Sequence, residues 1–209
     1  MIISIEGIDG AGKNTLARAL TERISADRLA FPRYEESIHA QLAARALRLE
    51  MGDLTNSAYA MATLFALDRH GVVEKLRAAS GRDEILLLDR YVASNAAYSW
   101  ARTEDESVVQ WVFDLEFGDL GLPQPDLQVL LDTPVKVAAE RAEKRAEADA
   151  SRAKDAYETD GGLQARTCEA YRRLAATSWA GQWIVAQPNE DVSSLAERII
   201  TRIQAQKNL

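Results

Sequence analysis

The amino-acid sequence predicts an α/β fold in which a five-stranded, mainly parallel sheet is flanked by helices. Short apolar runs of strand length alternate along the chain with longer segments that have helical spacing, which is typical of a parallel sheet. The run at 85–88 is continuously apolar, and the run at 127–131 is apolar except for Gln128, as in strands that are buried on both faces. A chain of 209 residues has the size of one domain, so we expect residues 1–209 to form a single unit.

The first half of the chain begins with a short, largely β-branched run that ends in a glycine-rich turn, which is typical of a strand. Leu16, Leu20 and Ile24 then recur at helical spacing. Alanine and leucine dominate two later segments at the same spacing. The segment before Phe31 is short, so we expect the second strand to be clipped. The elements predicted here are strands at 2–5 and 29–31 and helices at 14–24, 37–51 and 57–79.

The second half repeats the alternation of strands and helices. Gly121, Pro123 and Pro125 mark a loop at 118–126, and Pro134 suits the first turn of a helix. Gly161 and Gly162 are expected to interrupt a later helical segment. The elements predicted here are strands at 85–88, 127–131 and 183–185 and helices at 94–101, 106–117, 135–152, 156–177 and 192–206.

Composition excludes several classes of protein. The net charge is -7, whereas a protein that binds duplex nucleic acid normally has a basic excess. The longest apolar stretch, at 58–67, is too short to span a bilayer. The first residues meet Glu6 without a basic region, unlike a signal peptide, so we expect a cytoplasmic protein with neither nucleic acid nor membrane as a partner. Cys168 is the single cysteine, which excludes an intrachain disulfide.

A phosphate-binding loop is predicted between the first strand and the first helix. The segment Gly7-Ile8-Asp9-Gly10-Ala11-Gly12-Lys13-Asn14-Thr15 fits the P-loop pattern G-x-x-x-x-G-K in the context that the pattern requires. Glycine allows positive φ and a close approach of the backbone to a phosphate. Successive N–H groups and the helix N-terminus then attract the anion, and the lysine adds a mobile charge. The predicted ATP-binding residues of this loop are Gly10, Ala11, Gly12, Lys13, Asn14 and Thr15.

One position departs from the usual P-loop. Asn14 stands where a Ser or Thr hydroxyl normally ligates Mg²⁺. Thr15 follows one residue later, where the helix turns it away by about 100°. Any metal must therefore be held otherwise, and Asp9 inside the loop is a candidate ligand, directly or through water.

The P-loop alone leaves several classes of protein open. A GTPase needs an N-K-x-D motif to read its base, and none of the five asparagines is followed by lysine. Asp68 and Gly71 match a D-x-x-G switch formally, but they lie in a predicted helix. A small phosphotransferase and a nucleotide-binding module without turnover both remain possible at this point.

Three further segments resemble motifs of the thymidylate kinase family. Residues 85–98 read I-L-L-L-D-R-Y-V-A-S-N-A-A-Y, which resembles the family's D-R-[YF]-x-x-S-x-x-A-Y signature. Residues 31–34, F-P-R-Y, are similar to its F-P-R motif, and residues 64–69, L-F-A-L-D-R, to its L-F-x-x-D-R helix. Together with the P-loop they follow the family order, and the resemblance is closest to the actinobacterial branch.

The resemblance implies a P-loop nucleoside monophosphate kinase fold, with a five-stranded parallel sheet and a short lid at about 141–158. It implies Mg²⁺-dependent transfer of a phosphoryl group from ATP to dTMP, which gives ADP and dTDP. It also implies a homodimer that packs through long helices, for which the helix predicted at 57–79 is a candidate. A kinase for another nucleotide or nucleoside, and a non-catalytic nucleotide-binding regulator, are the alternatives.

The acceptor phosphate is expected to meet Arg90. This arginine follows Asp89 at the carboxyl end of a buried strand, where its guanidinium can fork onto a phosphate. In the family the matching arginine grips the acceptor monophosphate and helps to set the in-line geometry. Tyr34 is expected to touch the phosphate or the sugar.

The base is expected to meet Phe65 and Arg69, which are four residues apart and therefore share a helix face. The resemblance implies that the ring stacks on thymine while the guanidinium donates to its O4 atom. The Asn95 amide can donate and accept, which matches the N3–H and O4 edge of thymine. In the family Ser94 and Asn95 lie near the base, and Tyr98 packs below the 2′ carbon of the sugar.

The helix and loop after residue 140 are rich in basic residues. Arg141 and Arg145 are four residues apart on one face, which in isolation would be a solvated face. In a kinase of this family the segment is the lid, so Arg141 and Arg145 are predicted to bind ATP. Because position 14 is not arginine, Arg145 and Arg152 are predicted to supply the catalytic charge. The resemblance also implies that Tyr157 covers the nucleotide and that Glu158 holds Mg²⁺ opposite Asp9.

Overall fold

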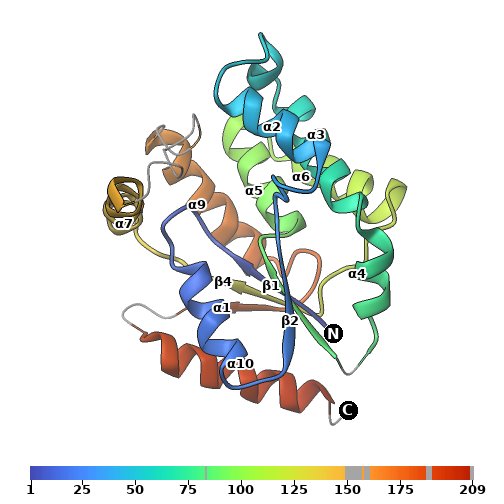
Figure 1. Cartoon of the computed structure of the whole chain (residues 1–209), viewed down its shortest axis with the longest axis vertical. Coiled ribbons are helices and arrows are strands. Elements are labelled where there is room, and N and C mark those ends of the chain that lie inside the picture. The colour runs from blue at the N-terminus through green and yellow to red at the C-terminus, as the bar shows by residue number, and fades with distance from the viewer. Residues whose placement is uncertain (83, 149–156, 158–160, 187–189, 208–209) are drawn as a thin grey trace.

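Five parallel strands form one sheet in the order β2-β3-β1-β4-β5 (Figure 1). The computed structural model describes residues 1–82, 84–148, 157, 161–186 and 190–207, without the side chains of 145–148 and 207. The observed sheet and its flanking helices confirm the predicted fold class. The strands are β1 (Ile2–Glu6), β2 (Ala26–Ala30), β3 (Ile85–Asp89), β4 (Leu127–Leu130) and β5 (Trp183–Val185).

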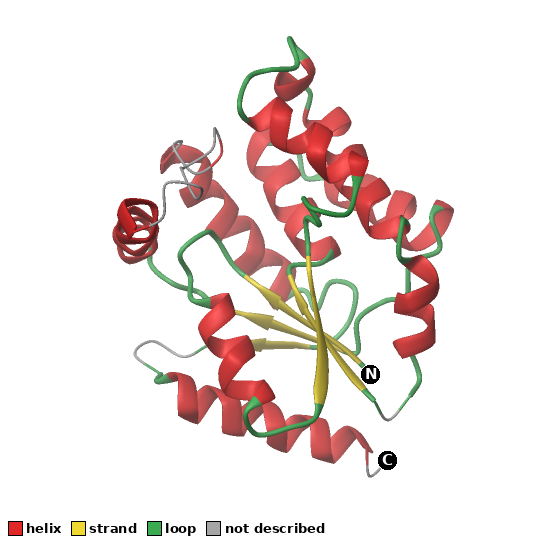
Figure 2. Ribbon diagram, in the orientation of Figure 1, coloured by secondary structure: helices red, strands yellow, loops and turns green. Residues whose placement is uncertain are grey.

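The helices of the described residues lie around this sheet (Figure 2). Among them, none combines the length and the apolar character that crossing a membrane requires. They are α1 (Lys13–Thr21), α2 (Ile38–Leu47), the 3-10 helix η1 (Leu54–Asn56), α3 (Ala58–His70), α4 (Val73–Ala79), α5 (Val92–Thr103), α6 (Ser107–Phe113), the π-helix η2 (Asp114–Asp119), α7 (Val135–Ala148), α9 (Gly161–Ala176) and α10 (Val192–Lys207).

The alternation of side chains along each strand builds a three-layer structure. Ile3 and Leu87 point to the face that α1 and α10 cover, and they belong to one hydrophobic cluster with those helices. Ile2, Leu86 and Leu88 point to the opposite face and pack with α4, α5, α6 and α9. Both faces of the inner strands are therefore buried, which explains why β3 is continuously apolar from Ile85 to Leu88. Figure 1 shows α1 and α10 on one side of the sheet and α5 and α9 on the other.

The second strand is complete, so the expectation of a clipped strand was wrong. β2 begins at Ala26 and pairs with β3 along its whole length, from Ala26 opposite Ile85 to Ala30 opposite Asp89. It is the edge strand, and Asp27 and Arg28 are exposed. An edge strand that is open to solvent carries polar residues, so its apolar signal covered only the end of the strand.

Two predicted helices differ from the observed ones. The segment 57–79 divides at Gly71 and Val72 into α3 and α4, rather than forming one long helix. The segment 106–117 changes at Asp114 from the α-helix α6 into the π-helix η2, which widens the turn. The two glycines at 161 and 162 stand at the start of α9 in the described residues.

The core leucine of β3 provides a test of this packing. Leu87 is 1% exposed, whereas Leu49 is 71% exposed. We expect Leu87→Ala to lower the free energy of unfolding by about 2–5 kcal/mol, because it leaves a cavity in the core. The matched Leu49→Ala change should cost less than about 0.5 kcal/mol. Urea unfolding of both variants measures the difference, and equal losses would contradict the assigned layers.

Candidate active site

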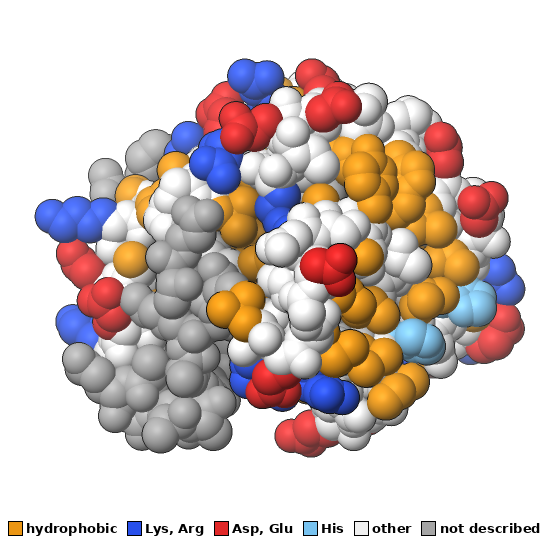
Figure 3. All heavy atoms as spheres, turned by 90° about the horizontal axis from the view of Figure 1, so that it is seen from above, with side chains coloured by type: hydrophobic (Ala, Val, Ile, Leu, Met, Phe, Trp, Pro, Cys, Tyr) orange, Lys and Arg blue, Asp and Glu red, His pale blue; other side chains and the backbone are white. Residues whose placement is uncertain are grey.

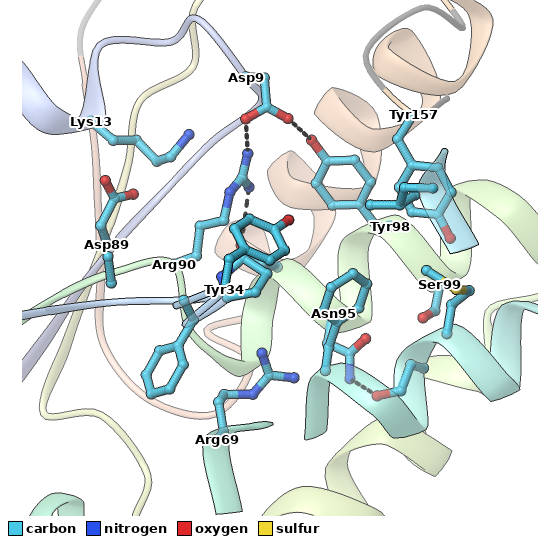
Figure 4. A pocket seen from close by; sticks show the side chains of 18 of the residues that line it. Asp9, Lys13, Tyr34, Arg69, Asp89, Arg90, Asn95, Tyr98, Ser99 and Tyr157 are labelled. Carbon is cyan, nitrogen blue, oxygen red and sulfur yellow. Dashed lines mark hydrogen bonds and ion pairs between the residues drawn. The ribbon is translucent and has the colours of Figure 1, made fainter. Parts of the chain in front are cut away.

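A cavity of about 700 Å³ opens at the carboxyl ends of β1 and β3, where parallel sheets bind ligands (Figure 4). It runs from the P-loop to the α3–α5 region, so it brings together segments that are far apart in the sequence. The predicted site residues that line it are Asp9, Gly10, Gly12, Lys13, Asn14, Thr15, Tyr34, Phe65, Arg69, Arg90, Ser94, Asn95, Tyr98, Arg141 and Tyr157.

The P-loop has the backbone that an anion site requires. Gly10 and Gly12 have φ of 79° and 103°, in the left-handed region that favours glycine. A Cβ on Gly10 would lie 2.0 Å from the carbonyl oxygen of Ala138, so only glycine fits against α7. Gly12 caps α1, which begins at Lys13 and directs its N-terminus at the cavity. Ala11 is buried and contributes its backbone to the loop.

Lys13 lies over its own loop. Its side chain is buried, and Nζ donates hydrogen bonds to the carbonyl oxygens of Gly7 (3.2 Å) and Ile8 (3.0 Å). Burial and the neighbouring Arg90 lower the pKa of Lys13 to about 8, although Asp9, Asp89 and Glu6 oppose them. A triphosphate would raise this pKa again, because an opposite charge favours the ammonium form.

Arg90 joins the P-loop to the end of β3. Its Nη2 donates to Asp9 Oδ1 at 2.7 Å and its Nη1 to the carbonyl oxygen of Gly7 at 2.9 Å. The Tyr98 hydroxyl donates to the other Asp9 oxygen at 3.2 Å. Burial would raise the pKa of Asp9, but the charges of Arg90 and Lys13 hold it well below its usual range. Asp9 is therefore an ionised carboxylate between the two halves of the cavity (Figure 4).

A buried polar cluster supports Arg90 from below. The Ser94 hydroxyl donates to Glu6 Oε2 at 2.7 Å and lies 2.7 Å from the Tyr171 hydroxyl. Arg90 Nη1 donates to the same Ser94 oxygen at 3.3 Å. Burial raises the pKa of Glu6. The structure thus places Ser94 beside the arginine, at the floor of the cavity.

The opposite end of the cavity holds Phe65, Arg69 and Asn95, as the sequence predicted. Arg69 is 3% exposed and forms a two-fold ion pair with Glu116, with Nε to Oε2 at 2.5 Å and Nη2 to Oε1 at 2.7 Å. Asn95 donates to Glu116 Oε1 at 2.7 Å. Glu116 was not predicted. Its spacing could have indicated that it is buried. Glu116 comes four residues after Val112 and three after Phe113, so it continues the buried side of α6.

Arg102 is a second residue that the sequence did not indicate. It lies four residues after Tyr98 on α5, so the two share a helix face. It donates to the Tyr157 hydroxyl and to the carbonyl oxygen of Thr55, and its guanidinium lies 5.0 Å from the centre of the Tyr157 ring. Tyr157 stacks on Tyr98 with the ring centres 5.9 Å apart. These three side chains form one wall of the cavity.

The lid is described in part. Arg141 lines the cavity, and a Cβ on Gly12 would be 3.7 Å from its Nη1, so this arginine reaches the P-loop. The side chain of Arg145, and Arg152 and Glu158, lie outside the described residues. Asn14, which stands where the P-loop usually has Ser or Thr, accepts a hydrogen bond of 2.8 Å from Arg28 of β2. The sequence did not predict a cation at this position.

The donor set of the site fits Mg²⁺ in the way that kinases hold it. Within the described part of the chain, no group of three or more His, Cys, Asp or Glu residues could form a metal cage. Asp9 is an ionised carboxylate of the P-loop, and Asp89 at the end of β3 lines the same cavity. Mg²⁺ in nucleotide sites is held by one or two carboxylates together with substrate phosphates and water, so one protein carboxylate is sufficient.

The two ends of the cavity define a class of protein. A P-loop with its lysine is suited to a polyphosphate, and the Arg90 guanidinium beside Asp9 could take a second anion within the same cavity. This arrangement is that of a P-loop phosphotransferase. A family model described as thymidylate kinase matches residues 5–198, and the chain belongs to the thymidylate kinase family, whose members are phosphotransferases.

Relatives and solved structures agree with this assignment. The chain is 48% identical to the thymidylate kinase of Mycobacterium tuberculosis, over 94% of this chain and 95% of the relative. It is 31% identical to a probable thymidylate kinase 1 of Saccharolobus solfataricus, over 100% and 98%. The fold is similar to that of Candida albicans thymidylate kinase, with a TM-score of 0.73, 20% identity and coverage of 99% and 92%. The actinobacterial resemblance is thereby confirmed.

The titration of Lys13 gives a test of the P-loop as the ATP-binding part of the cavity. The pKa of Lys13 is about 8 before the triphosphate binds and higher afterwards, so the ammonium predominates at about pH 7 and is mostly lost by about pH 9 in the free protein. ATP affinity should therefore be constant at lower pH and fall as the pH rises, by roughly tenfold between about pH 7 and about pH 9. Titration calorimetry measures it. The affinity for dTMP, which depends on the permanently charged Arg90, is the control, and an equal loss for both ligands would contradict the prediction.

Proposed function

We propose that this chain transfers the γ-phosphoryl group of ATP to dTMP and releases ADP and dTDP, in a Mg²⁺-dependent reaction. The observation that carries the proposal is a single cavity with three parts. A P-loop suited to a polyphosphate lies beside the guanidinium of Arg90, which pairs with Asp9. The third part offers hydrogen bonds from Arg69 and Asn95 and has no net charge, because Glu116 balances Arg69. Family membership agrees with the proposal. A non-catalytic regulator would have no need for the Arg90 guanidinium.

The donor end is proposed to bind ATP through backbone amides and cations. The amides of Gly10, Gly12 and the first turn of α1 would donate to the phosphates, and Ala11, whose amide donates to the carbonyl oxygen of Ile8 at 3.2 Å, would contribute the turn of the backbone. Lys13 would exchange its carbonyl partners for phosphate oxygens, and Arg141 would approach from α7. We propose Asp9 and Glu158 as the carboxylates that would hold Mg²⁺, whose charge would offset that of the phosphates. Arg145 and Arg152 are proposed to complete the site from the lid.

The acceptor phosphate is proposed to bind at Arg90, with Tyr34 beside it. The side chain of Arg90 is held by Asp9, Gly7 and Ser94, so its orientation is set before an acceptor arrives. Phosphoryl transfer to a monophosphate needs no general base, because the acceptor oxygen is already anionic. Positioning and charge stabilisation are therefore the main contributions of these residues.

The base is proposed to lie against Phe65, with its edge at Arg69 and Asn95. Arg69 would donate to O4 of thymine, and Asn95 would accept from N3–H. Cytosine presents the inverted pattern and would be rejected. Tyr98 is proposed to pack below the 2′ carbon, where a ribose hydroxyl would collide with its ring. Its own hydroxyl is bound to Asp9, which keeps the ring in place.

We expect Arg90 to be required for turnover. In a coupled assay of ADP release from ATP·Mg²⁺, dTMP should be used far better than dCMP or AMP, and dUMP should come second. Arg90→Ala should lower kcat/KM for dTMP by at least about a hundredfold, because a charge-assisted fork is lost. The ATP affinity should change little. Turnover with another acceptor alone would overturn the base assignment, and none at all would leave a binding protein.

A homodimer is proposed to form on the face of α3 and α6. Tyr59 of α3 is 42% exposed and packs edge-to-face on Trp111 of α6, with ring centres 4.8 Å apart. Figure 3 shows apolar side chains gathered into a broad patch on the view from above, where α2 and α3 lie. Large exposed apolar patches mark contact surfaces.

The cytoplasm is the proposed site of action.

The dimer proposal is tested by sedimentation velocity. Tyr59→Glu should shift the protein from dimer to monomer, because the new carboxylate would be buried without a partner in the interface. Val192→Glu is the control, since Val192 is similarly exposed but begins α10 on the other layer. A monomeric unmodified protein, or a Tyr59 variant that stays dimeric, would show that this face is not the interface.

A further inference from the structure

Glu116 is a buried carboxylate that contacts the two residues proposed to read the base. It is 0% exposed, and its two oxygens accept from Arg69 at 2.5 and 2.7 Å. Oε1 also accepts from Asn95 Nδ2 at 2.7 Å. Arg69 and Asn95 both line the cavity, whereas Glu116 lies behind them. It can therefore act on a ligand through these neighbours.

Glu116 determines which atom of the Asn95 amide faces the cavity. The Nδ2 atom donates both to Glu116 Oε1 and to the carbonyl oxygen of Ala62, at 2.7 and 3.0 Å. An ionised carboxylate and a carbonyl can only accept, so neither position can take the amide oxygen. The opposite orientation would place Oδ1 against two acceptors. Asn95 therefore presents its oxygen, an acceptor, on the cavity side (Figure 4).

The same carboxylate sets the plane of the Arg69 guanidinium. Nε and Nη2 are engaged by Glu116, which leaves Nη1 as the end that points into the cavity (Figure 4). Burial opposes the charge of Arg69, but Glu116 outweighs it and raises the pKa of Arg69. The pair as a whole is neutral, so it offers a hydrogen-bond donor to an uncharged base without a net charge.

The backbone holds Glu116 at this place. It lies within the π-helix η2, whose wider turn follows directly after α6. Its neighbour Phe117 packs on Phe113 and Trp179, with ring centres 5.1 and 6.0 Å apart. Single π-turns inside helices are frequent at functional sites. The turn thus aims one carboxylate at α3 and α5 together.

We infer that Glu116 is the positioning residue that sets the pyrimidine specificity of this cavity. By fixing Arg69 as a donor and Asn95 as an acceptor, it produces the pattern that complements O4 and N3–H, and it blocks the inverted pattern that cytosine needs. The inference rests on the proposed function, because it places the acceptor's base at this end of the cavity.

Glu116→Gln tests the inference, because the new side chain has the same shape but can also donate. Its amide can donate to Asn95 Oδ1, so only the carbonyl oxygen of Ala62 then opposes a turned Asn95 amide that presents its N–H₂ group to the cavity. The measurement is the ratio of dissociation constants for dCMP and dTMP, by titration calorimetry. This ratio should fall by at least about tenfold, the usual effect of one mispaired buried hydrogen bond.

Two controls separate specificity from a structural role. The dUMP-to-dTMP ratio should stay within about twofold, because uracil and thymine share the same O4 and N3–H edge. Asp68→Asn removes a different buried carboxylate, which lies on α3 and pairs with Arg33 at 3.0 Å. This change should leave the dCMP-to-dTMP ratio unchanged. Calorimetry gives the binding-competent fraction as stoichiometry, so partial unfolding does not alter the ratios.

The outcomes are distinct. Glu116→Asp keeps the charge but is one methylene shorter, so its ratio should lie between those of the unmodified protein and Glu116→Gln. An unchanged dCMP-to-dTMP ratio in both variants, or an equal fall in Asp68→Asn, would overturn the inference. An unmodified protein that does not prefer dTMP to dCMP would instead overturn the proposed function.

Discussion

The ion pair between Arg90 and Asp9 is the contact on which the cavity depends, because it joins the loop after β1 to the end of β3. Tyr98 of α5 donates to the same carboxylate, and Ser94 and Glu6 support the arginine from below. Arg90 has a φ of 67°, a left-handed conformation that is unfavourable for a side chain with a Cβ. Such a strained backbone persists where many surrounding contacts hold the residue in place. Here the contacts of Arg90 hold its guanidinium over the P-loop.

The two ends of the cavity solve opposite electrostatic problems. At the proposed phosphate end, Lys13, Arg90 and Arg141 would supply positive charge to anions that the P-loop amides would also attract. At the proposed base end, Glu116 neutralises Arg69, so an uncharged ring would meet a directional donor and not a net charge. Burying such a pair seldom stabilises a fold, because both ions lose their hydration. Its value lies in the single arrangement of hydrogen bonds that it permits.

Much of this site was predictable because its residues lie in short segments next to strands. The P-loop glycines follow β1 directly, and Arg90 follows β3, so topology alone places them at one edge of the sheet. Helical spacing placed Phe65 and Arg69 on one face, and only the family resemblance indicated that this face belongs to the site. Arg102 and Glu116 were missed, since their roles come from partners 21 to 55 residues away in the sequence. Local periodicity carries no information on such pairs.

By itself, the sequence determined the alternation of strands and helices, the buried inner strands and the family motifs, because each of these is written within a few neighbouring residues. Tertiary structure decided the rest. It showed that β2 is a full edge strand, which a search for apolar runs misses because its central residues are polar. It also showed that α6 widens into a π-helix at Asp114. It also decided that Arg69 is half of a buried pair with Glu116. Such facts depend on which distant side chains share a desolvated space, and that is settled only when the helices pack.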